Sequence, residues 1–345
     1  MPLVLFWSVW SVTALVASGL LATKLIGWAA ARGAVDIPNA RSSHSRATPR
    51  GGGIAIVVVT ALAAAVACLL HPESIRPVLG VLAPALVIAG VSWLDDVRSL
   101  PNRIRFAVHL ACAIAAVAVL GPVREVNVGS FGSIAFGPAA WPLTLLWIVA
   151  LTNAFNFMDG IDGIAGITAA ISAAAIASVA AACASPAIGG VAAAFAAAAC
   201  GFLACNWHPA KIFMGDVGSA FCGFMLAALP LALPLAAVPT AVAVASAALW
   251  PFIFDTAYTL VRRLRNRENI FQAHRSHLYQ RLVIAGWSHR AVSSLYGALS
   301  LVTAALAVAP LFAPSLRQPA DLAAVATIVF GIASLLALVL VSEKK

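Results

Sequence analysis

The sequence predicts an all-α membrane protein, a bundle of about eleven transmembrane helices that forms one domain over residues 1–345. Hydrophobic residues make up 62% of the chain and charged residues only 10%, whereas about 25% of a soluble domain is charged. The mean hydropathy of +0.99 agrees with this class. Lipid is therefore the main solvent, and no stretch is left for a separate soluble domain.

Apolar runs long enough to cross about 30 Å of hydrocarbon define the expected helices. They cover residues 3–31, 53–70, 78–94, 104–120, 138–155, 164–184, 187–206, 217–236, 238–261, 291–313 and 320–342. The first run lacks a preceding basic segment, which favours a retained span over a cleaved signal peptide. Pro230, Pro234 and Pro239 also allow one kinked helix between the eighth and ninth runs, and an even count would move the C-terminus across the membrane.

Positive residues predict the orientation, because they remain on the cytoplasmic side. The loops after odd-numbered spans carry Arg32, Arg41, Arg46, Arg50, Arg98, Arg103, Arg105, Lys211, Arg262, Arg263, Arg265, Arg267, Arg275, Arg281 and Arg290, with Lys344 and Lys345 at the end. The opposite loops carry Arg76, Arg124 and Arg317. The N-terminus is therefore expected in the periplasm and the C-terminus in the cytoplasm. The net charge of +9 mostly reflects this asymmetry, so it indicates anionic substrates and no nucleic-acid partner.

Five cytoplasmic loops, at residues 32–53, 94–104, 153–164, 206–219 and 262–290, hold the candidate active site. The first is basic and ends in Gly51–Gly53, so Arg46, Arg50 and the free amides could bind phosphate oxygens. A positively charged anchor with a flexible turn is the alternative. In the fourth loop, Lys211 precedes Asp216, whose glycine neighbours would admit a phosphate or a metal ion closely.

The second loop begins with the adjacent acids Asp95 and Asp96. Neighbouring helical residues point about 100° apart, so the two carboxylates are expected to divide the work, one as a base and one as an orienting group. A hydrated acidic turn closed by Arg98 and Arg103 is the alternative.

In the third loop, Asn153, Asn156, Asp159 and Asp162 recur every three residues, and a glycine follows each aspartate. This spacing drifts around a helix, so the row is expected to leave the helix end and surround a pocket. Two amides and two carboxylates suit a hard cation and the polar edges of a nucleotide. A purely structural role is the alternative.

The last loop contains His274 and His277, which share a helix face, and Arg281 one turn further along. These cations could close over a diphosphate, or they could be ordinary surface residues. Asp255 lies about 9 Å below the membrane boundary at 1.5 Å per residue. We expect it to have a structural role, by snorkelling or by pairing with Arg262 or Arg263.

Taken in order, these segments resemble the polyprenyl-phosphate N-acetylhexosamine-1-phosphate transferases over almost the whole chain. The resemblance rests on four segments: Asp95–Asp96, residues 153–163 with their two asparagines and two aspartates, Gly215–Ser219, and the last loop with His274, His277 and Arg281. It implies a magnesium-dependent phosphoglycosyl transferase, with Mn²⁺ as a substitute, in the bacterial inner membrane. The enzyme would move N-acetylhexosamine-1-phosphate from a UDP-sugar to undecaprenyl phosphate and release UMP.

The same resemblance assigns roles to individual residues. Asn156 and Asp216 would hold the metal, Asp95 would activate the lipid phosphate and Asp96 would support it. Nucleotide and pyrophosphate would contact Asp159 and Asp162, and the diphosphate or sugar would contact His274, His277 and Arg281. Further substrate-binding residues are expected at Arg46, Arg50, Asn153 and Lys211.

The expected pathway is O-antigen or a related envelope polysaccharide, and a homodimer is compatible with the sequence. The peptidoglycan branch of this family, the phospho-N-acetylmuramoyl-pentapeptide transferases, has consecutive histidines where this chain has His-Arg-Ser-His, which argues against that substrate. A nucleotide-sugar or lipid transporter and an inactive scaffold are the alternatives from other classes. The reaction is expected to proceed by direct attack of the lipid phosphate, with a covalent aspartyl-phosphate route as the alternative.

Overall fold

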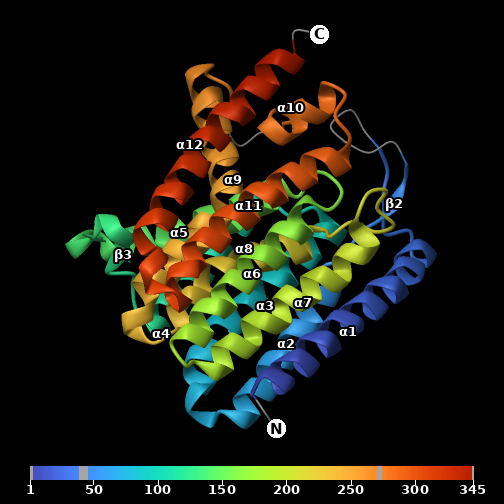
Figure 1. Cartoon of the computed structure of the whole chain (residues 1–345). Coiled ribbons are helices and arrows are strands. Elements are labelled where there is room, and N and C mark those ends of the chain that lie inside the picture. The colour runs from blue at the N-terminus through green and yellow to red at the C-terminus, as the bar shows by residue number, and fades with distance from the viewer. Residues whose placement is uncertain (1–2, 39–45, 270–273, 344–345) are drawn as a thin grey trace.

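The computed structural model describes residues 3–38, 46–269 and 274–343, so parts of the first and last predicted loops lie outside the described residues. The described helices are α1 (Leu3–Ala31), α2 (Ile54–Leu70), α3 (Ile75–Arg98), α4 (Asn102–Leu120), α5 (Ala140–Met158), α6 (Ile164–Ala182), α7 (Pro186–Asn206), α8 (Asp216–Ala228), α9 (Val238–Arg265), α10 (Leu278–Ile284), α11 (His289–Phe312) and α12 (Arg317–Ser342). Short 3₁₀ helices are η1 (Pro72–Ser74), η2 (Gly129–Phe131), η3 (Gly137–Ala139), η4 (Leu229–Ala232), η5 (Leu235–Ala237) and η6 (Pro314–Leu316). Together the helices form one bundle (Figure 1).

Each predicted apolar run is helical over most of its length, which confirms the all-α class. Within the described residues, nine helices are long and apolar enough to cross a membrane, while α2 and the α8–η4 unit are shorter. The chain is therefore a multi-pass membrane protein, and the number of crossings and their orientation stay predictions. The beginning of α1 and the end of α12 lie at opposite ends of the bundle, as an odd number of crossings would place them (Figure 1).

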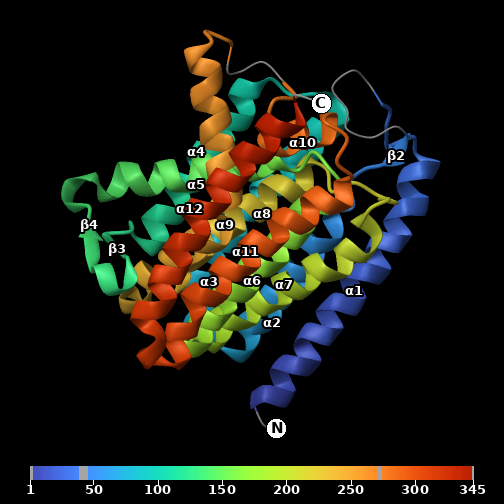
Figure 2. The same cartoon turned by 45° about the horizontal axis from the view of Figure 1, so that its top comes forward.

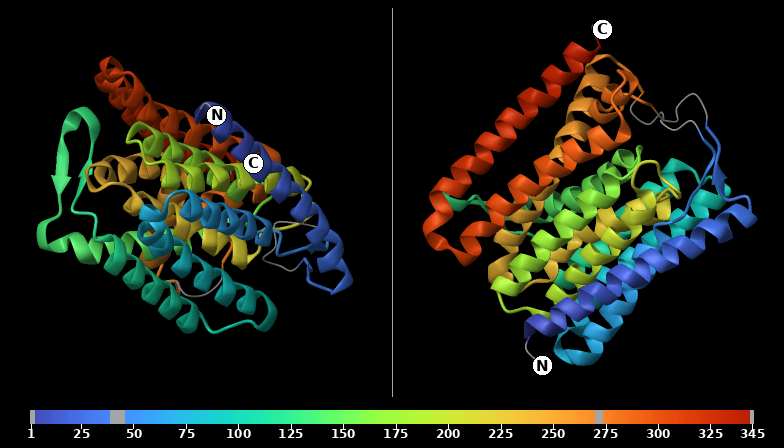
Figure 3. Two further views of the ribbon diagram at one scale, coloured as in Figure 1. Left: turned by 90° about the horizontal axis from the view of Figure 1, so that it is seen from below. Right: turned by 45° about the vertical axis from the view of Figure 1, so that its right-hand side comes forward.

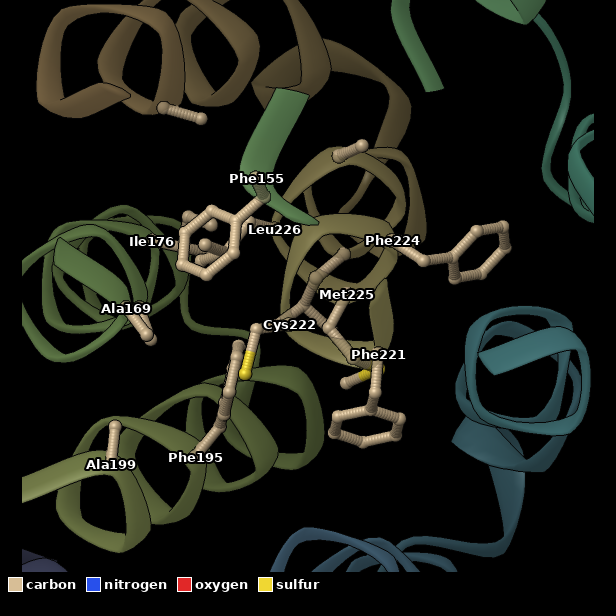
Figure 4. Close-up of a cluster of buried hydrophobic side chains, with 14 of the residues drawn as sticks. Phe155, Ala169, Ile176, Phe195, Ala199, Phe221, Cys222, Phe224, Met225 and Leu226 are labelled. Atoms are coloured by element: carbon tan, nitrogen blue, oxygen red, sulfur yellow. The ribbon is translucent and has the colours of Figure 1, made fainter. Parts of the chain in front are cut away.

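Helix α8 occupies the centre of the bundle, and its residues from Val217 to Ala228 are all buried. Figure 4 shows its side chains pointing in several directions, with Phe221 and Cys222 facing Phe195 of α7 and Leu226 facing Phe155 of α5. A helix that is apolar on every side is buried either in a protein core or in lipid, and here other helices cover every side of α8. Because α8 is enclosed, its N-terminal residue Asp216 has a fixed position.

Glycines let the helices around α8 approach closely. A Cβ atom on Gly53, just before α2, would lie 2.4 Å from Cα of Gly218 on α8. On the other side of α7, Ser18 of α1 donates a hydrogen bond of 2.7 Å to the carbonyl of Ala198, and α1 runs beside α7 (Figure 3). The contact at Gly53 brings the end of the first loop, with Arg50, next to the start of α8.

Between α8 and α9 the helix is interrupted, so the two segments do not form one kinked helix. Helix α8 passes into η4, Leu233 is extended with φ −73° and ψ 162°, and η5 leads into α9. The alternative of one kinked helix is therefore wrong. Helix α9 itself is continuous through Pro251 and runs four residues past its predicted end, to Arg265.

Small elements outside the spans were not predicted. A hairpin of β3 (Glu125–Asn127) and β4 (Ser133–Ala135) projects at one edge of the bundle (Figures 2 and 3), with Val126 opposite Ile134. In the first loop, β1 (Val35–Asp36) pairs with β2 (Thr48–Pro49). The short helix α10 lies in the last loop and packs against α9, α11 and α12.

Candidate active site at the ends of α3, α5 and α8

Asp95 and Asp96 end α3 and bind different partners, as their spacing predicts. Asp95 is buried, and its Oδ1 accepts a hydrogen bond of 2.6 Å from the amide of Leu100. Its Oδ2 forms an ion pair of 2.8 Å with Nη1 of Arg105. Both oxygens of Asp95 are therefore engaged.

Asp96 faces the first loop and the start of α8. Its Oδ1 lies 3.1 Å from Nη2 of Arg50. The amides of Asp216 and Val217 approach its two oxygens at 3.4 and 3.3 Å. A carboxylate is stabilised at a helix N-terminus by such free amides and by the helix dipole. Asp96 therefore joins α3 and Arg50 to the first turn of α8.

Arg105 of α4 lies at the centre of the acidic side chains. Its Nη2 is 3.1 Å from Oδ2 of Asp216 and 3.1 Å from Oδ1 of Asn156. Nδ2 of Asn156 donates in turn to Oγ of Ser219 at 2.8 Å. The oxygens of Asn156 and Asp216 thus converge on one cationic nitrogen, although they come from different helices.

Asp159 begins the turn between α5 and α6 and is half-buried. Burial raises its pKa well above the usual value, and the charges of Asp216, Asp96 and Asp162 act in the same direction. The row of polar residues does leave the helix end, as predicted, because α5 stops at Met158 and α6 starts after Gly163 at φ +80°.

Asp162 is held by two histidines. Its Oδ2 lies 2.7 Å from Nδ1 of His208 and accepts a bond of 3.1 Å from the amide of Ala210, and its Oδ1 lies 3.3 Å from Nδ1 of His289. Burial alone would raise its pKa, but the hydrogen bonds from His289, His208 and Ala210 outweigh burial and lower it. These contacts join the third loop to the fourth loop and to the start of α11.

The last loop is only partly arranged as the sequence analysis expected. His274 and His277 lie close together, with ring centroids 5.0 Å apart. Arg281, however, makes two hydrogen bonds of 2.6 Å to the carboxylate of Glu343 at the end of α12. In this structure Arg281 is therefore turned to α12 and paired there.

Asp255 also has partners other than those expected. Its side chain is fully buried, and His277 Nδ1 lies 3.1 Å from its Oδ1. The expectation that it snorkels or pairs with Arg262 or Arg263 is wrong, because its oxygens are bonded to residues of α10 and α11 instead.

The remaining predicted residues make no hydrogen bond or ion pair with the central acidic side chains in the described part of the chain. Arg46 and Lys211 are exposed, and Asn153 is half-buried, with its amide donating 2.7 Å to the carbonyl of Val149 in its own helix. The structure thus brings together Asp95, Asp96, Asn156, Asp216 and Arg50, and places Asp159 near enough for its pKa to respond to Asp216. His274 and His277 lie together in the last loop, while Arg281 is paired with Glu343.

Three further side chains belong to the site and were not predicted from the sequence: Arg105, His208 and His289. Arg105 was counted only as a topology signal. Its position shows a stronger signal, because it stands one turn before His109 and two turns before Cys112, which lie on the buried face of α4. No comparable signal marks His208 or His289.

Two groups of side chains could hold a metal ion. The first contains the convergent oxygens of Asn156 and Asp216, and Arg105 occupies the place that a cation would take. Amide and carboxylate oxygens suit a hard ion such as Mg²⁺. The second contains Asp162, His208 and His289, whose ligand atoms lie within 4.8 Å of one another. In that group the 2.7 Å contact has the length of a hydrogen bond, which satisfies these side chains without a metal.

Acidic and amide oxygens gathered around a cation at one end of a membrane bundle define the class of the protein as a membrane enzyme acting on charged substrates. Residues 78–233 match the family model described as glycosyl transferase family 4. The chain belongs to this family, the superfamily of polyprenyl-phosphate N-acetylhexosamine-1-phosphate transferases.

Several curated relatives support this assignment. A protein of Bacillus subtilis (strain 168), named "Probable undecaprenyl-phosphate N-acetylglucosaminyl 1-phosphate transferase", is 34% identical over 75% of this chain and 72% of its own length. The decaprenyl-phosphate N-acetylglucosaminephosphotransferase of Mycobacterium tuberculosis (strain ATCC 25618 / H37Rv) is 32% identical over 89% of this chain and 82% of its own. A phospho-N-acetylmuramoyl-pentapeptide-transferase of Trichormus variabilis is 33% identical over 53% of each chain. The chain is accordingly a phosphoglycosyl transferase.

Proposed function

We propose that this protein transfers N-acetylhexosamine-1-phosphate from a UDP-sugar to undecaprenyl phosphate and releases UMP, with Mg²⁺ as the metal. An oxygen of the lipid phosphate forms a bond to the β-phosphorus of the donor. The bond from that phosphorus to the oxygen bridging it to the α-phosphorus breaks, and this oxygen leaves with UMP. The names of the relatives support these substrate classes, because they give a polyprenyl phosphate as the acceptor and N-acetylglucosamine phosphate as the transferred group.

The convergence of Asn156 and Asp216 carries the proposal. Both oxygens lie 3.1 Å from the same nitrogen of Arg105, so they are already directed at one point. Mg²⁺ bound there would offset the negative charge of two phosphate-bearing substrates. Asn156 and Asp216 would hold the metal in place of the Arg105 guanidinium, which could then bind a phosphate group.

Asp95 and Asp96 favour direct attack over a covalent aspartyl-phosphate route. The oxygens of Asp95 are engaged by Arg105 and Leu100, and those of Asp96 by Arg50 and the amides of α8. In a covalent route one of these oxygens would bond to phosphorus and give up the partner that holds it, whereas in direct attack both aspartates can stay as bases or orienting groups. Release of Arg105 would free Asp95 first, so Asp95 is the better candidate for orienting the lipid phosphate or accepting its proton.

The remaining residues would bind the donor. Asp159 follows the end of α5 and Asn153 lies in its last two turns. Arg46, Lys211, His274 and His277 would contribute positive or hydrogen-bonding groups from the other loops. Because these residues belong to the loops that are rich in arginine, we place the site on the cytoplasmic face of the bacterial inner membrane, where UDP-sugars occur. The five loops then form one active site within a single domain.

The pathway we propose is O-antigen or a related envelope polysaccharide, with an N-acetylhexosamine as the sugar. A muramoyl-pentapeptide donor is the second candidate, because one relative with that name matches half of the chain. The His-Arg-Ser-His sequence argues against it. A homodimer stays a prediction.

Release of UMP from UDP-N-acetylglucosamine by the purified protein in detergent tests the proposal. We expect release only when undecaprenyl phosphate and Mg²⁺ are both present, and Mn²⁺ should replace Mg²⁺. Other UDP-acetamido sugars and UDP-muramoyl-pentapeptide, assayed in parallel, identify the donor. Release that is independent of the lipid phosphate, or absent with every donor, would show that the proposed reaction is wrong.

A further inference from the structure

Asp255 lies within α9, is fully buried, and accepts hydrogen bonds from five groups. The donors are the amide of Leu278 at 2.8 Å, the amide of Tyr279 at 3.1 Å, Nδ1 of His277 at 3.1 Å, Oη of Tyr296 at 2.7 Å and Oγ1 of Thr259 at 3.2 Å. A buried carboxylate is costly unless its oxygens are satisfied in this way. Its acceptor sites are occupied, so Asp255 is not placed to react with a substrate.

The donors to Asp255 connect three helices. Leu278 and Tyr279 are the first residues of α10, and His277 is its N-cap. A helix leaves its first amides without partners, and here a carboxylate from α9 accepts two of them. Since α10 has only seven residues, it is too short to be stable by itself. Its position therefore depends on contacts with its neighbours, and the hydrogen bonds from its first two amides to Asp255 are among them.

Helix α10 in turn contacts the turn that contains Asp159. Oη of Tyr279 donates a hydrogen bond of 3.1 Å to the carbonyl of Phe157. A Cβ atom on Gly160 would lie 2.0 Å from this Oη and 3.3 Å from Nε2 of Gln280. The first turn of α10 is thus packed against the backbone on both sides of Asp159.

The ring of His277 completes this group. It stacks on Tyr279 with centroids 5.8 Å apart and an interplanar angle of 22°. When Nδ1 donates to Asp255, Nε2 of His277 remains as an acceptor. One buried carboxylate thereby sets the orientation of this histidine and the place of the helix that follows it.

We propose that Asp255 is a positioning residue that fixes α10 and His277 against the Asp159 turn and so completes the active site. Its effect on turnover rests on the proposed function. Its effect on the position of α10 does not, because it follows from hydrogen bonds within the protein.

The first test is hydrogen exchange of the full-length protein in detergent, without substrate. The variant Asp255→Asn replaces one acceptor oxygen with a donor, so we expect the amides of residues 278–284 to exchange about tenfold faster, the usual effect of losing a helix cap. Residues 164–182 of α6 should be unchanged. The variant Ser246→Ala is the matched control, because Ser246 is on α9 and bonds only within that helix. Unchanged protection of α10 would overturn the proposal.

Tyr296→Phe is the milder variant and decides the matter if Asp255→Asn fails to fold. It removes one donor of 2.7 Å and keeps the carboxylate. We expect faster exchange in residues 278–284, by a smaller factor than for Asp255→Asn. Faster exchange spread equally over α6 and α10 would contradict a local role.

Transferase kinetics give the second readout. We expect Asp255→Asn to lower kcat about tenfold and to leave KM for undecaprenyl phosphate nearly unchanged, since contacts with the lipid are not altered. In a Tyr279→Phe background the same change should cost less, because both variants disturb one connection to the Asp159 turn. Full additivity would overturn the proposal. If the wild-type protein showed no transferase activity, the proposed function would fail while hydrogen exchange would still decide the role of Asp255.

Discussion

The acidic side chains at the ends of α3 and α8 and the single acid Asp255 differ in how their charges are balanced. At the first place, Asp95, Asp96 and Asp216 share Arg50 and Arg105, and the side chain of Asp216 is 34% exposed. At the second place, Asp255 has no exposed surface and five donors. Both groups of side chains lie at the same end of the bundle.

The difference indicates which carboxylates are available for chemistry. Three negative charges against two positive charges leave a site that favours one more cation, and part of Asp216 remains accessible to it. Fully satisfied carboxylates such as Asp255 hold elements in place, because any new ligand would first have to break several hydrogen bonds. Asp162, held by His208, His289 and Ala210, belongs with Asp255 in this respect.

The variant Asp216→Asn should give the largest change and tests the comparison directly. It removes a proposed metal ligand and one of the crowded negative charges. We expect transferase activity to fall by at least about 100-fold, as the loss of several kcal/mol of transition-state stabilisation implies, while the melting temperature stays equal or rises. UMP release and thermal unfolding measure the two effects. Normal Mg²⁺-dependent turnover would remove Asp216 from the metal site.

The variant Asp159→Asn tests the comparison of the two groups of acids through the pH dependence of the protein's stability. The native state holds the Asp159 proton more tightly than the unfolded chain, because its pKa is raised. Above about pH 4 the unfolded chain therefore binds fewer protons, and the native state loses stability as pH rises through the raised pKa. The variant lacks this loss, so its melting temperature should exceed that of the wild type by an amount that grows with pH. A constant difference would show that the pKa of Asp159 is not raised in the native state.

Arg281→Ala and Glu343→Gln should give the smallest change in stability and decide the role of Arg281. Their contact lies near the surface, so either variant should lower the free energy of unfolding by less than about 1 kcal/mol. If Arg281 also binds the diphosphate of the donor, Arg281→Ala will raise KM for the UDP-sugar and Glu343→Gln will not. Equal kinetics for both variants would restrict Arg281 to its pair with Glu343.

Much of the site could be predicted because the chain marks it locally. Asp95, Asp96, Asn156 and Asp216 stand at the ends of apolar runs, where few charged residues occur, and the structure brings them together. The roles of Arg281 and Asp255 could not be read in the same way. The partner of Arg281 is Glu343, 62 positions away, and Asp255 is covered by α10, a helix that has no apolar run to reveal it.

Hydropathy along the chain determined the fold class and the helices, since a membrane requires each span to satisfy its own backbone and to be apolar over a fixed length. Those are properties of a continuous segment. The convergence of Asn156 and Asp216 on Arg105, and the placement of α10 by Asp255, were decided only by the tertiary structure. They depend on which helix ends meet in space, and packing around the central helix α8 determines that.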